Sequence, residues 1–182
     1  MRVGPGAGGQ GDCQDDPVRL SSSHRPRRAA AAWLAVPLLA AAVSGCGETD
    51  PGTPAACLNG PAAYRQALAE APGPVRLEGG VAISECLPRN QGAGPQEVVG
   101  RSLLATAAGL AERRADGDHA EAAALKAGYL VGAVRRGAED SEGIHATLAN
   151  RVSTSASNGL DGESARVRES YDRGLTAGLE DG

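Results

Sequence analysis

After residue 60, apolar residues return every three or four positions along most of the chain, which is the period of helices buried on one side. The first predicted helix begins at Gly60-Pro61, because proline fits the first helical turn, and it ends before Pro72 and Pro74. Its apolar face consists of Tyr64, Ala67, Leu68 and Ala71.

Four more helices are predicted in the rest of the chain. The first two occupy about residues 95–115 and 118–136, with a break at Asp116-Gly117 between them. Asp118 and Glu121 have the spacing of a capping box, which starts the second of these helices.

The last two helices are separated by Asn158-Gly159. Ser141 is the expected cap of the earlier one, and the later one starts near Gly162. The apolar positions of the four helices are, in chain order, Val99, Leu103, Ala107, Leu110 and Ala111; Leu125, Leu130, Val131 and Val134; Ile144, Leu148 and Val152; and Val167, Tyr171, Leu175 and Leu179.

Residues 75–88 have a different pattern, in which apolar and polar residues alternate on both sides of Gly79-Gly80. Alternation around a glycine turn predicts either a short hairpin or an extended loop. The fold class expected for the chain is therefore mainly α: a small bundle of about five helices with one short extended or hairpin segment.

Small residues have to supply much of the packing, because Leu, Ile and Val make up only 23 of the 126 residues from Cys57 onward. Gly128 and Gly132, and likewise Gly174 and Gly178, lie four residues apart, as close helix packing requires. Tyr64, Tyr129 and Tyr171 fall on apolar faces, where filling the core is favoured over stacking on a ligand.

The N-terminal part of the chain has the order of a secretory signal. Arg25, Arg27 and Arg28 precede residues 29–43, which carry no charge. This run of fifteen residues contains Pro37 and is shorter than the ~20 residues of a membrane-spanning helix. Residues 1–45 are therefore predicted to be a leader.

The sequence Val43-Ser44-Gly45-Cys46 at the end of this leader resembles the lipobox of bacterial lipoproteins. The resemblance implies that Cys46 receives a diacylglyceryl group and becomes the first residue of the mature protein, anchored to the outer face of the cell membrane. Alternatives are an ordinary signal peptide with a coincidental cysteine, an uncleaved anchor, and a twin-arginine signal at Arg27-Arg28.

The predicted domain boundaries follow from this leader. Residues 1–24 are unusual before a signal, so translation is hypothesised to start near Val18 or Leu20, and residues 25–45 form the signal peptide. Residues 46–56 are rich in Pro, Gly and Thr and form a flexible tether. The helical domain then comprises residues 57–182.

Two cysteines remain in the predicted mature domain. Cys57 and Cys86 form an even pair in a compartment that permits disulfides, and a bridge between them would pin the extended segment to the bundle. The alternative is a reactive thiol, which would require a nearby histidine or helix N-terminus.

Charge and motifs narrow the function classes. The net charge is +2 for residues 1–45 and −6 for residues 46–182. The acidic domain lacks the basic stripe of a nucleic-acid-binding protein, so no nucleic-acid partner is expected. No catalytic or nucleotide-binding motif is found, the acidic cluster at residues 116–121 does not fit a calcium loop, and neither a metal nor a cofactor is expected.

Candidate ligand contacts lie between the third and fourth predicted helices. Arg135 and Arg136 at a helix end, together with His145, are predicted to face a bound anion. His145 follows Ile144 and is also expected to be partly buried and hydrogen-bonded.

Three hypotheses of function remain. The first is a lipid-anchored, non-enzymatic module that binds another envelope protein or stabilises an assembly, its membrane link being the lipid on Cys46. The second is a lipoprotein that binds a small ligand or anion, and the third is a hydrolase acting on cell-wall material. The sequence leaves the partner and the oligomeric state open.

Overall fold

The computed structural model describes residues 52–117 and 119–182 of the chain. The chain divides into two units, Met1–Gly45 and Cys46–Gly182, and all described residues belong to the second. The predicted leader, with its lipobox-like sequence, and Cys46 lie outside the described residues.

The described residues form a helical bundle and contain no β-strand. Its five α-helices are α1 (Gly60–Ala67), α2 (Ala93–Ala115), α3 (Ala120–Asp140), α4 (Ala146–Ser157) and α5 (Ala165–Asp181). Five short 3₁₀ helices connect or extend them: η1 (Ala55–Leu58), η2 (Leu68–Glu70), η3 (Glu78–Gly80), η4 (Ser84–Cys86) and η5 (Leu160–Gly162). The predicted mainly α fold class is confirmed.

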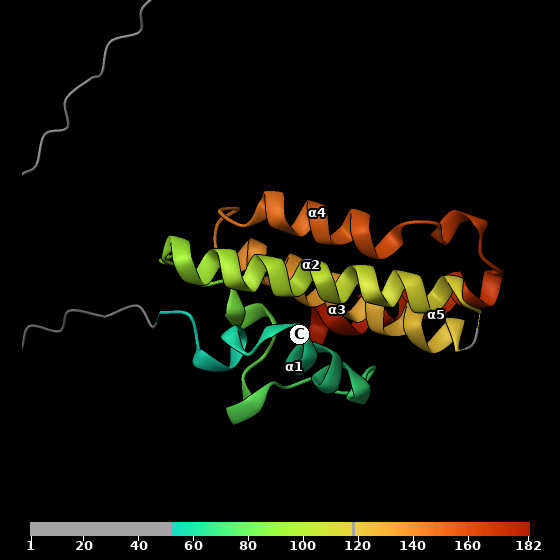
Figure 1. Ribbon diagram of the computed structural model, residues 1–182, viewed down its shortest axis with the longest axis horizontal. Helices are drawn as coiled ribbons and strands as arrows, with labels where there is room; N and C mark the ends of the chain where they lie inside the picture. Colours follow the sequence, from blue (N-terminus) through green and yellow to red (C-terminus); the bar gives the residue numbers. More distant parts are fainter. Residues whose placement is uncertain (1–51, 118) are drawn as a thin grey trace, which may run out of the picture. The chain divides into compact units, whose positions relative to one another are not determined.

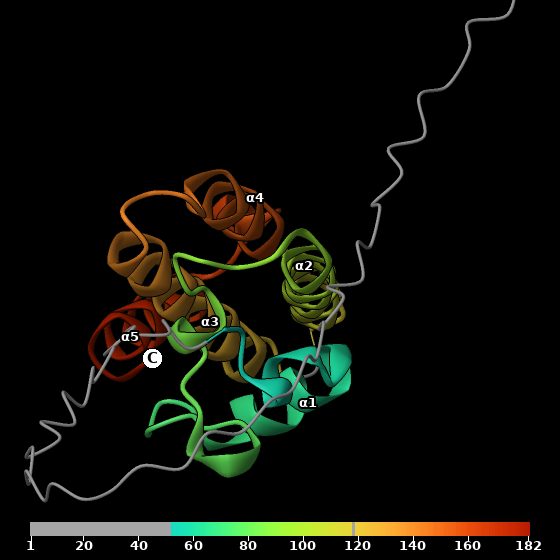
Figure 2. The same ribbon diagram turned by 90° about the vertical axis from the view of Figure 1, so that its left-hand side faces the viewer.

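Helix α3 is the centre of the bundle (Figures 1 and 2). It packs against α5, α2 and α4, while α1 packs against α2. The buried core accordingly includes residues from every α-helix, and Leu130, Val131 and Val134 of α3 are fully enclosed. In the described part of the chain, none of the helices has both the length and the apolar character needed to cross a membrane.

Glycines bring α3 and α5 into backbone contact. A Cβ atom placed on Gly128 or Gly132 of α3 would lie within 3 Å of backbone atoms of α5. The same holds for Gly174 and Gly178 of α5 against the backbone of α3. The predicted close packing of these four glycines is confirmed, and it accounts for a tight interface with few large side chains.

The segment between α1 and α2 is extended and carries the disulfide. Gly79 and Gly80 both have positive φ, and the Leu77 amide donates a hydrogen bond to the Val81 carbonyl, but no strands form among the described residues. Of the two predicted alternatives, a short hairpin and an extended loop, the structure has the extended loop. The predicted Cys57–Cys86 disulfide is confirmed, with both cysteines fully buried and 5.5 Å between their Cα atoms.

Tyrosines attach this segment to the helices. The Tyr129 hydroxyl of α3 accepts a hydrogen bond from the Val75 amide at 3.1 Å. The Tyr64 hydroxyl of α1 donates to the Cys57 carbonyl at 2.9 Å. Together with Tyr171, these side chains are buried, so the prediction that the tyrosines fill the core is confirmed.

The predicted start of the fourth helix at Ser141 is wrong. Helix α3 extends to Asp140, so Ser141 caps its C-terminal end, where the Ser141 hydroxyl donates to the Ala138 carbonyl. Helix α4 starts only at Ala146, and Ile144, which precedes it, is 57% exposed rather than buried.

At the start of α3 the N-cap residue is His119 with φ 65°, not Asp118, because the helix begins at Ala120. Asp118 itself lies outside the described residues.

The described residues include part of the predicted tether ahead of Cys57. The Thr53 hydroxyl accepts a hydrogen bond from the Gln91 side chain at 2.9 Å, and Ala56 packs against the core. Residues 53–56 of the predicted tether therefore lie against the bundle.

Candidate functional site

The three residues predicted to face one anion do not converge. Arg135 is exposed, and its Nε lies 3.4 Å from the Ser153 hydroxyl of α4. Arg136 instead donates to the Glu180 carbonyl near the end of α5. Successive residues of an α-helix point about 100° apart, so the two arginines reach different neighbours of α3. The structure therefore does not bring the side chains of Arg135, Arg136 and His145 together at one point.

His145 lies in a pocket formed by other residues, between the N-terminal halves of α2 and α4. This α2–α4 pocket has a volume of about 370 Å³. Its polar lining comes from Gln96, Glu97, Arg101, His145, Thr147 and Arg151. Its apolar lining comes from Leu104, Ile144 and Leu148, with Gly100 leaving room next to Leu148.

A tight turn places His145 in the wall of this pocket. Glu142 and Gly143 adopt positive φ, which reverses the chain after α3 and makes His145 the N-cap residue of α4. The imidazole is only 1% exposed, and its Nε2 lies 3.1 Å from the Pro88 carbonyl. The predicted burial and hydrogen bonding of His145 are thus confirmed. Among the described atoms, Nδ1 has no hydrogen-bond partner.

The N-terminus of α4 lies at the same pocket. The first-turn amides of a helix have no intrahelical acceptors, and in the described structure no side chain caps this turn. Thr147 and Leu148 belong to the first turn and line the pocket. Uncapped amides and the positive end of the helix dipole favour an anion at this position.

Side-chain charges in the α2–α4 pocket leave one net positive charge. Arg101 is paired with Glu97 one turn earlier on α2, and both side chains are largely exposed. Arg151 of α4 is the second cation in the lining. The arginines and the glutamate of the lining therefore supply two positive charges and one negative charge.

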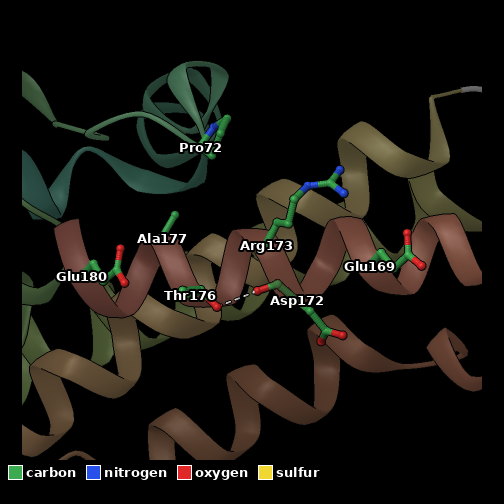
Figure 3. A pocket seen from close by; sticks show the side chains of 7 residues that line it. All are labelled: Pro72, Glu169, Asp172, Arg173, Thr176, Ala177 and Glu180. Carbon is green, nitrogen blue, oxygen red and sulfur yellow. Dashed lines mark hydrogen bonds between the residues drawn. The ribbon is translucent and has the colours of Figure 1, made fainter.

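A hollow of about 680 Å³ lies between the Pro72 turn and the outer face of α5 (Figure 3). Glu169 and Glu180 lie at opposite ends of it, and the Asp172 carboxylate points away from both. These carboxylates follow the exposed side of one helix and do not converge on a common point. In residues 52–117 and 119–182, no group of three His, Cys, Asp or Glu residues is placed to hold a metal ion.

Another hollow, of about 480 Å³, surrounds the end of α5. Here Arg76 donates to the Asp181 carbonyl at 2.7 Å, and Arg136 donates to the Glu180 carbonyl. Both arginines thus satisfy carbonyls that α5 leaves free in its last turn. We assign this arrangement to stability rather than to a ligand.

Arg114 is a buried cation that the sequence analysis did not single out. Its side chain is 1% exposed, and it donates to the Ala156 carbonyl at 2.8 Å and to the Asn158 carbonyl. Its Nε lies 3.5 Å from the Glu163 carboxylate. The sequence could have indicated this burial. Arg114 follows Leu110 by four residues and Ala107 by seven, which places it on the buried face of α2.

Two tyrosines have altered acidity. Burial raises the pKa of the Tyr64 hydroxyl far above its ordinary value. Burial also raises the pKa of Tyr171, although the nearby positive charges of Arg135 and Arg114 oppose the shift. Both phenols are therefore neutral at physiological pH and act as packing groups.

Neither the family models, the curated proteins nor the solved structures include a match to this chain.

Proposed function

We propose that this protein is an exported, lipid-anchored helical domain that acts as a non-enzymatic binding module at the outer face of the cell membrane. The observation that carries the proposal is the buried Cys57–Cys86 disulfide in a chain whose leader ends in Val43-Ser44-Gly45-Cys46. Structural disulfides persist in exported proteins and are rare in the reducing cytosol. The disulfide and the lipobox-like sequence are independent features that favour the same compartment.

The tether supports a role close to the membrane. Thr53 is fixed by its hydrogen bond to Gln91, and it lies seven positions after Cys46. Even fully extended, seven residues span only about 25 Å. Two or three acyl chains on Cys46 would anchor the domain stably at the bilayer, where a single chain gives marginal binding.

The surroundings of His145, the histidine best placed for acid–base chemistry, favour a binding role over catalysis. His145 contacts a backbone carbonyl through Nε2, and in the described part of the chain its Nδ1 contacts no nucleophile or carboxylate. General-base catalysis requires a nucleophile within hydrogen-bond reach of the base. The arrangement thus gives no support to the cell-wall hydrolase.

The anchor is tested by Cys46→Ser in a bacterial host, with Cys13→Ser as the matched control. The unchanged protein should fractionate with membranes, incorporate labelled fatty acid, and have the mass of residues 46–182 plus its acyl groups. Cys46→Ser should lose both the label and the cleavage, whereas Cys13→Ser should change neither. Unchanged mass and membrane partition in Cys46→Ser would refute the anchored function.

Tryptophan fluorescence gives an independent test of the cleavage. Trp33 is the single tryptophan of the chain and lies in the predicted leader. The mature protein should therefore emit only tyrosine fluorescence, and tryptophan emission from the membrane-extracted protein would contradict cleavage before Cys46.

The binding role is tested by photo-crosslinking in intact membranes. Amine-reactive reagents are poorly suited, because Lys126 is the only lysine in the chain. A photoreactive amino acid at Ile144, which is 57% exposed, samples the pocket end of the bundle. The same amino acid at Leu179, 40% exposed on α5, samples a second surface of the bundle. One dominant envelope-protein adduct at one position supports the module, and diffuse labelling at both contradicts it.

A further inference from the structure

We propose that Asn158 is a site of spontaneous deamidation and that Arg114 controls how fast this modification proceeds. Asn158 and Gly159 form the turn between α4 and η5. A glycine after asparagine favours the reaction, because no side chain hinders the backbone nitrogen that attacks the asparagine amide. The inference goes beyond the anchored binding role and does not depend on lipidation of Cys46.

The reaction needs only the chain itself and water. The Gly159 nitrogen loses its proton and bonds to Cγ of Asn158, and Nδ2 of Asn158 leaves as ammonia. Water then opens the resulting five-membered succinimide at either carbonyl, which yields aspartate or isoaspartate. Both products carry a negative charge at neutral pH that asparagine lacks. Isoaspartate also routes the backbone through the former side chain and so lengthens it by one carbon.

The two reacting groups are accessible in the structure. Asn158 and Gly159 are both exposed. Among the described residues, neither the side-chain amide of Asn158 nor the N–H of Gly159 makes a hydrogen bond. No partner therefore has to be released from either group before the reaction.

The backbone conformation of the turn opposes direct attack. Asn158 has ψ 119°, and Gly159 has φ 78° and ψ 0°, as in a type II turn. At this ψ the Gly159 nitrogen lies on the Hα side of Asn158, whereas closing the succinimide requires it on the Cβ side. Substituents of a tetrahedral carbon lie about 120° apart in projection, so the peptide plane between the two residues has to rotate by roughly 120° first.

Arg114 holds this peptide plane in its unreactive orientation. The guanidinium donates to the Asn158 carbonyl, which belongs to the rotating plane, and to the Ala156 carbonyl at 2.8 Å. The Arg114 side chain is 1% exposed, so the enclosing core keeps it from following the oxygen as the plane turns. Rotation therefore breaks a hydrogen bond to a charged group, which should slow deamidation about ten- to a hundred-fold.

Asn59-Gly60 is the second Asn-Gly pair of the chain and provides an internal reference. The Asn59 side-chain amide donates to the Glu78 carboxylate at 3.3 Å, and in the described part of the chain no arginine donates to the Asn59 carbonyl. Global unfolding should accelerate deamidation at both asparagines. Loss of the Arg114 contact should accelerate it at Asn158 alone.

The test follows deamidation of the full-length chain in detergent at neutral pH, by reduction, tryptic digestion and mass spectrometry. Residues 152–166 form one tryptic peptide, in which Asn158 is the only side-chain amide. A mass gain of this peptide therefore reports Asn158 specifically. In urea-unfolded protein, Asn158 should convert about ten-fold faster or more than in the folded protein.

Arg114→Met should raise the rate at Asn158 in the folded protein about ten- to a hundred-fold and leave the rate at Asn59 unchanged. Gly174→Ala disturbs the contact of α3 with α5 instead and is the control for lost stability. It should change neither rate. If circular dichroism shows that Arg114→Met does not fold, Arg114→Lys replaces it. Lysine keeps the charge on a flexible stem without the planar fork, so Asn158 should still convert faster than in the unchanged protein.

Three results would overturn the proposal. Asn158 could stay intact even in urea, which would remove the site. The folded Arg114 variant could deamidate at the rate of the unchanged protein, which would remove the control by Arg114. Finally, an equal acceleration at Asn59, or in Gly174→Ala, would mean that global unfolding sets the rate.

Discussion

Arg114 links the end of α2 to the end of α4 through a side chain that is almost completely enclosed. It supplies donors to the Ala156 and Asn158 carbonyls, which have no further helical turn to bond to, and it lies beside the Glu163 carboxylate. Replacing it by methionine keeps much of the volume but leaves these acceptors unpaired. We expect Arg114→Met to lower the free energy of unfolding by roughly 2–4 kcal/mol in urea titrations.

The preceding residue provides the control. Arg113 is exposed on the same helix, so Arg113→Met removes an identical charge without opening the core. Its free energy of unfolding should stay within about 0.5 kcal/mol of the unchanged protein. Equal effects of the two substitutions would mean that the buried hydrogen bonds of Arg114 contribute nothing specific.

Tyr64 makes the free energy of unfolding depend on pH in the alkaline range. Burial raises the pKa of its hydroxyl above the ordinary value of 10.0, so the folded state holds this proton more tightly than the unfolded state. The resulting stability is fully present below pH 10 and is lost as the pH rises beyond it. The loss should reach about 1.4 kcal/mol per pH unit for this one group.

The measurement is urea unfolding between pH 9 and 11, with Tyr64→Phe as the comparison. The variant should lose about 1 kcal/mol at pH 7, because the hydrogen bond to the Cys57 carbonyl is removed. Its stability should then fall less steeply above pH 10. Tyr171→Phe should reduce the slope less, because the positive charges of Arg135 and Arg114 oppose the rise in the pKa of Tyr171. Parallel curves for all three proteins would contradict this explanation.

The packing of α3 against α5 depends on the absence of side chains at four positions. A Cβ on Gly174 would lie within 3 Å of backbone atoms of Leu125 and Tyr129, and backbone cannot move aside as a flexible side chain can. We expect Gly174→Ala to force the helices apart and to lower the free energy of unfolding by about 1–3 kcal/mol or more. Thermal and urea unfolding followed by circular dichroism would measure the change.

Gly109 of α2 is the matched control for this substitution. It also lies within a long helix, but a Cβ there would meet no atom within 4 Å. Gly109→Ala should therefore stabilise the protein by about 0.5–1 kcal/mol, as helix propensity dictates. If both alanine substitutions stabilise the protein, the close approach of α3 and α5 does not contribute to the stability of the bundle.

At the level of elements, glycines and prolines at the helix ends made most helices predictable. Gly117 and Gly159 adopt positive φ where the sequence predicted breaks, and Pro61 lies in the first turn of α1. The start of α4 was not predictable in this way. Ile144 fits the apolar period of a helix. However, the turn through Glu142 and Gly143 follows the end of α3, and this turn leaves Ile144 outside α4.

The candidate site was predictable only in part, because it is made by two helices that are distant in sequence. The sequence placed His145 correctly as a buried, hydrogen-bonded residue. It then grouped His145 with Arg135 and Arg136, which are near in sequence, but Arg135 reaches Ser153 further along α4 and Arg136 reaches the end of α5. The arginines that share its pocket, Arg101 and Arg151, become neighbours only through the packing of α2 against α4.

At the scale of the whole domain, the extended segment and the bundle depend on each other. The segment of residues 71–92 has little regular structure, yet Val75, Ile83 and Leu87 are buried against the helices. Gly137 of α3 allows this contact, since a Cβ there would lie 2.5 Å from the Ser84 carbonyl oxygen. The disulfide closes the chain between α1 and this segment, and it therefore stabilises the tertiary arrangement rather than any one helix.

Removing the disulfide should consequently destabilise the domain as a unit. The bridge joins residues 29 apart, and the loop-entropy model assigns such a closure about 3–4 kcal/mol. We expect the double variant Cys57→Ala/Cys86→Ala to lose about this much in urea titrations at pH 7. The unchanged protein should approach the same value when dithiothreitol is added under unfolding conditions. The double variant should be insensitive to the reductant, because its bridge is already gone. A double variant that unfolds at the same urea concentration as the oxidised protein would show that helix packing alone holds the extended segment in place.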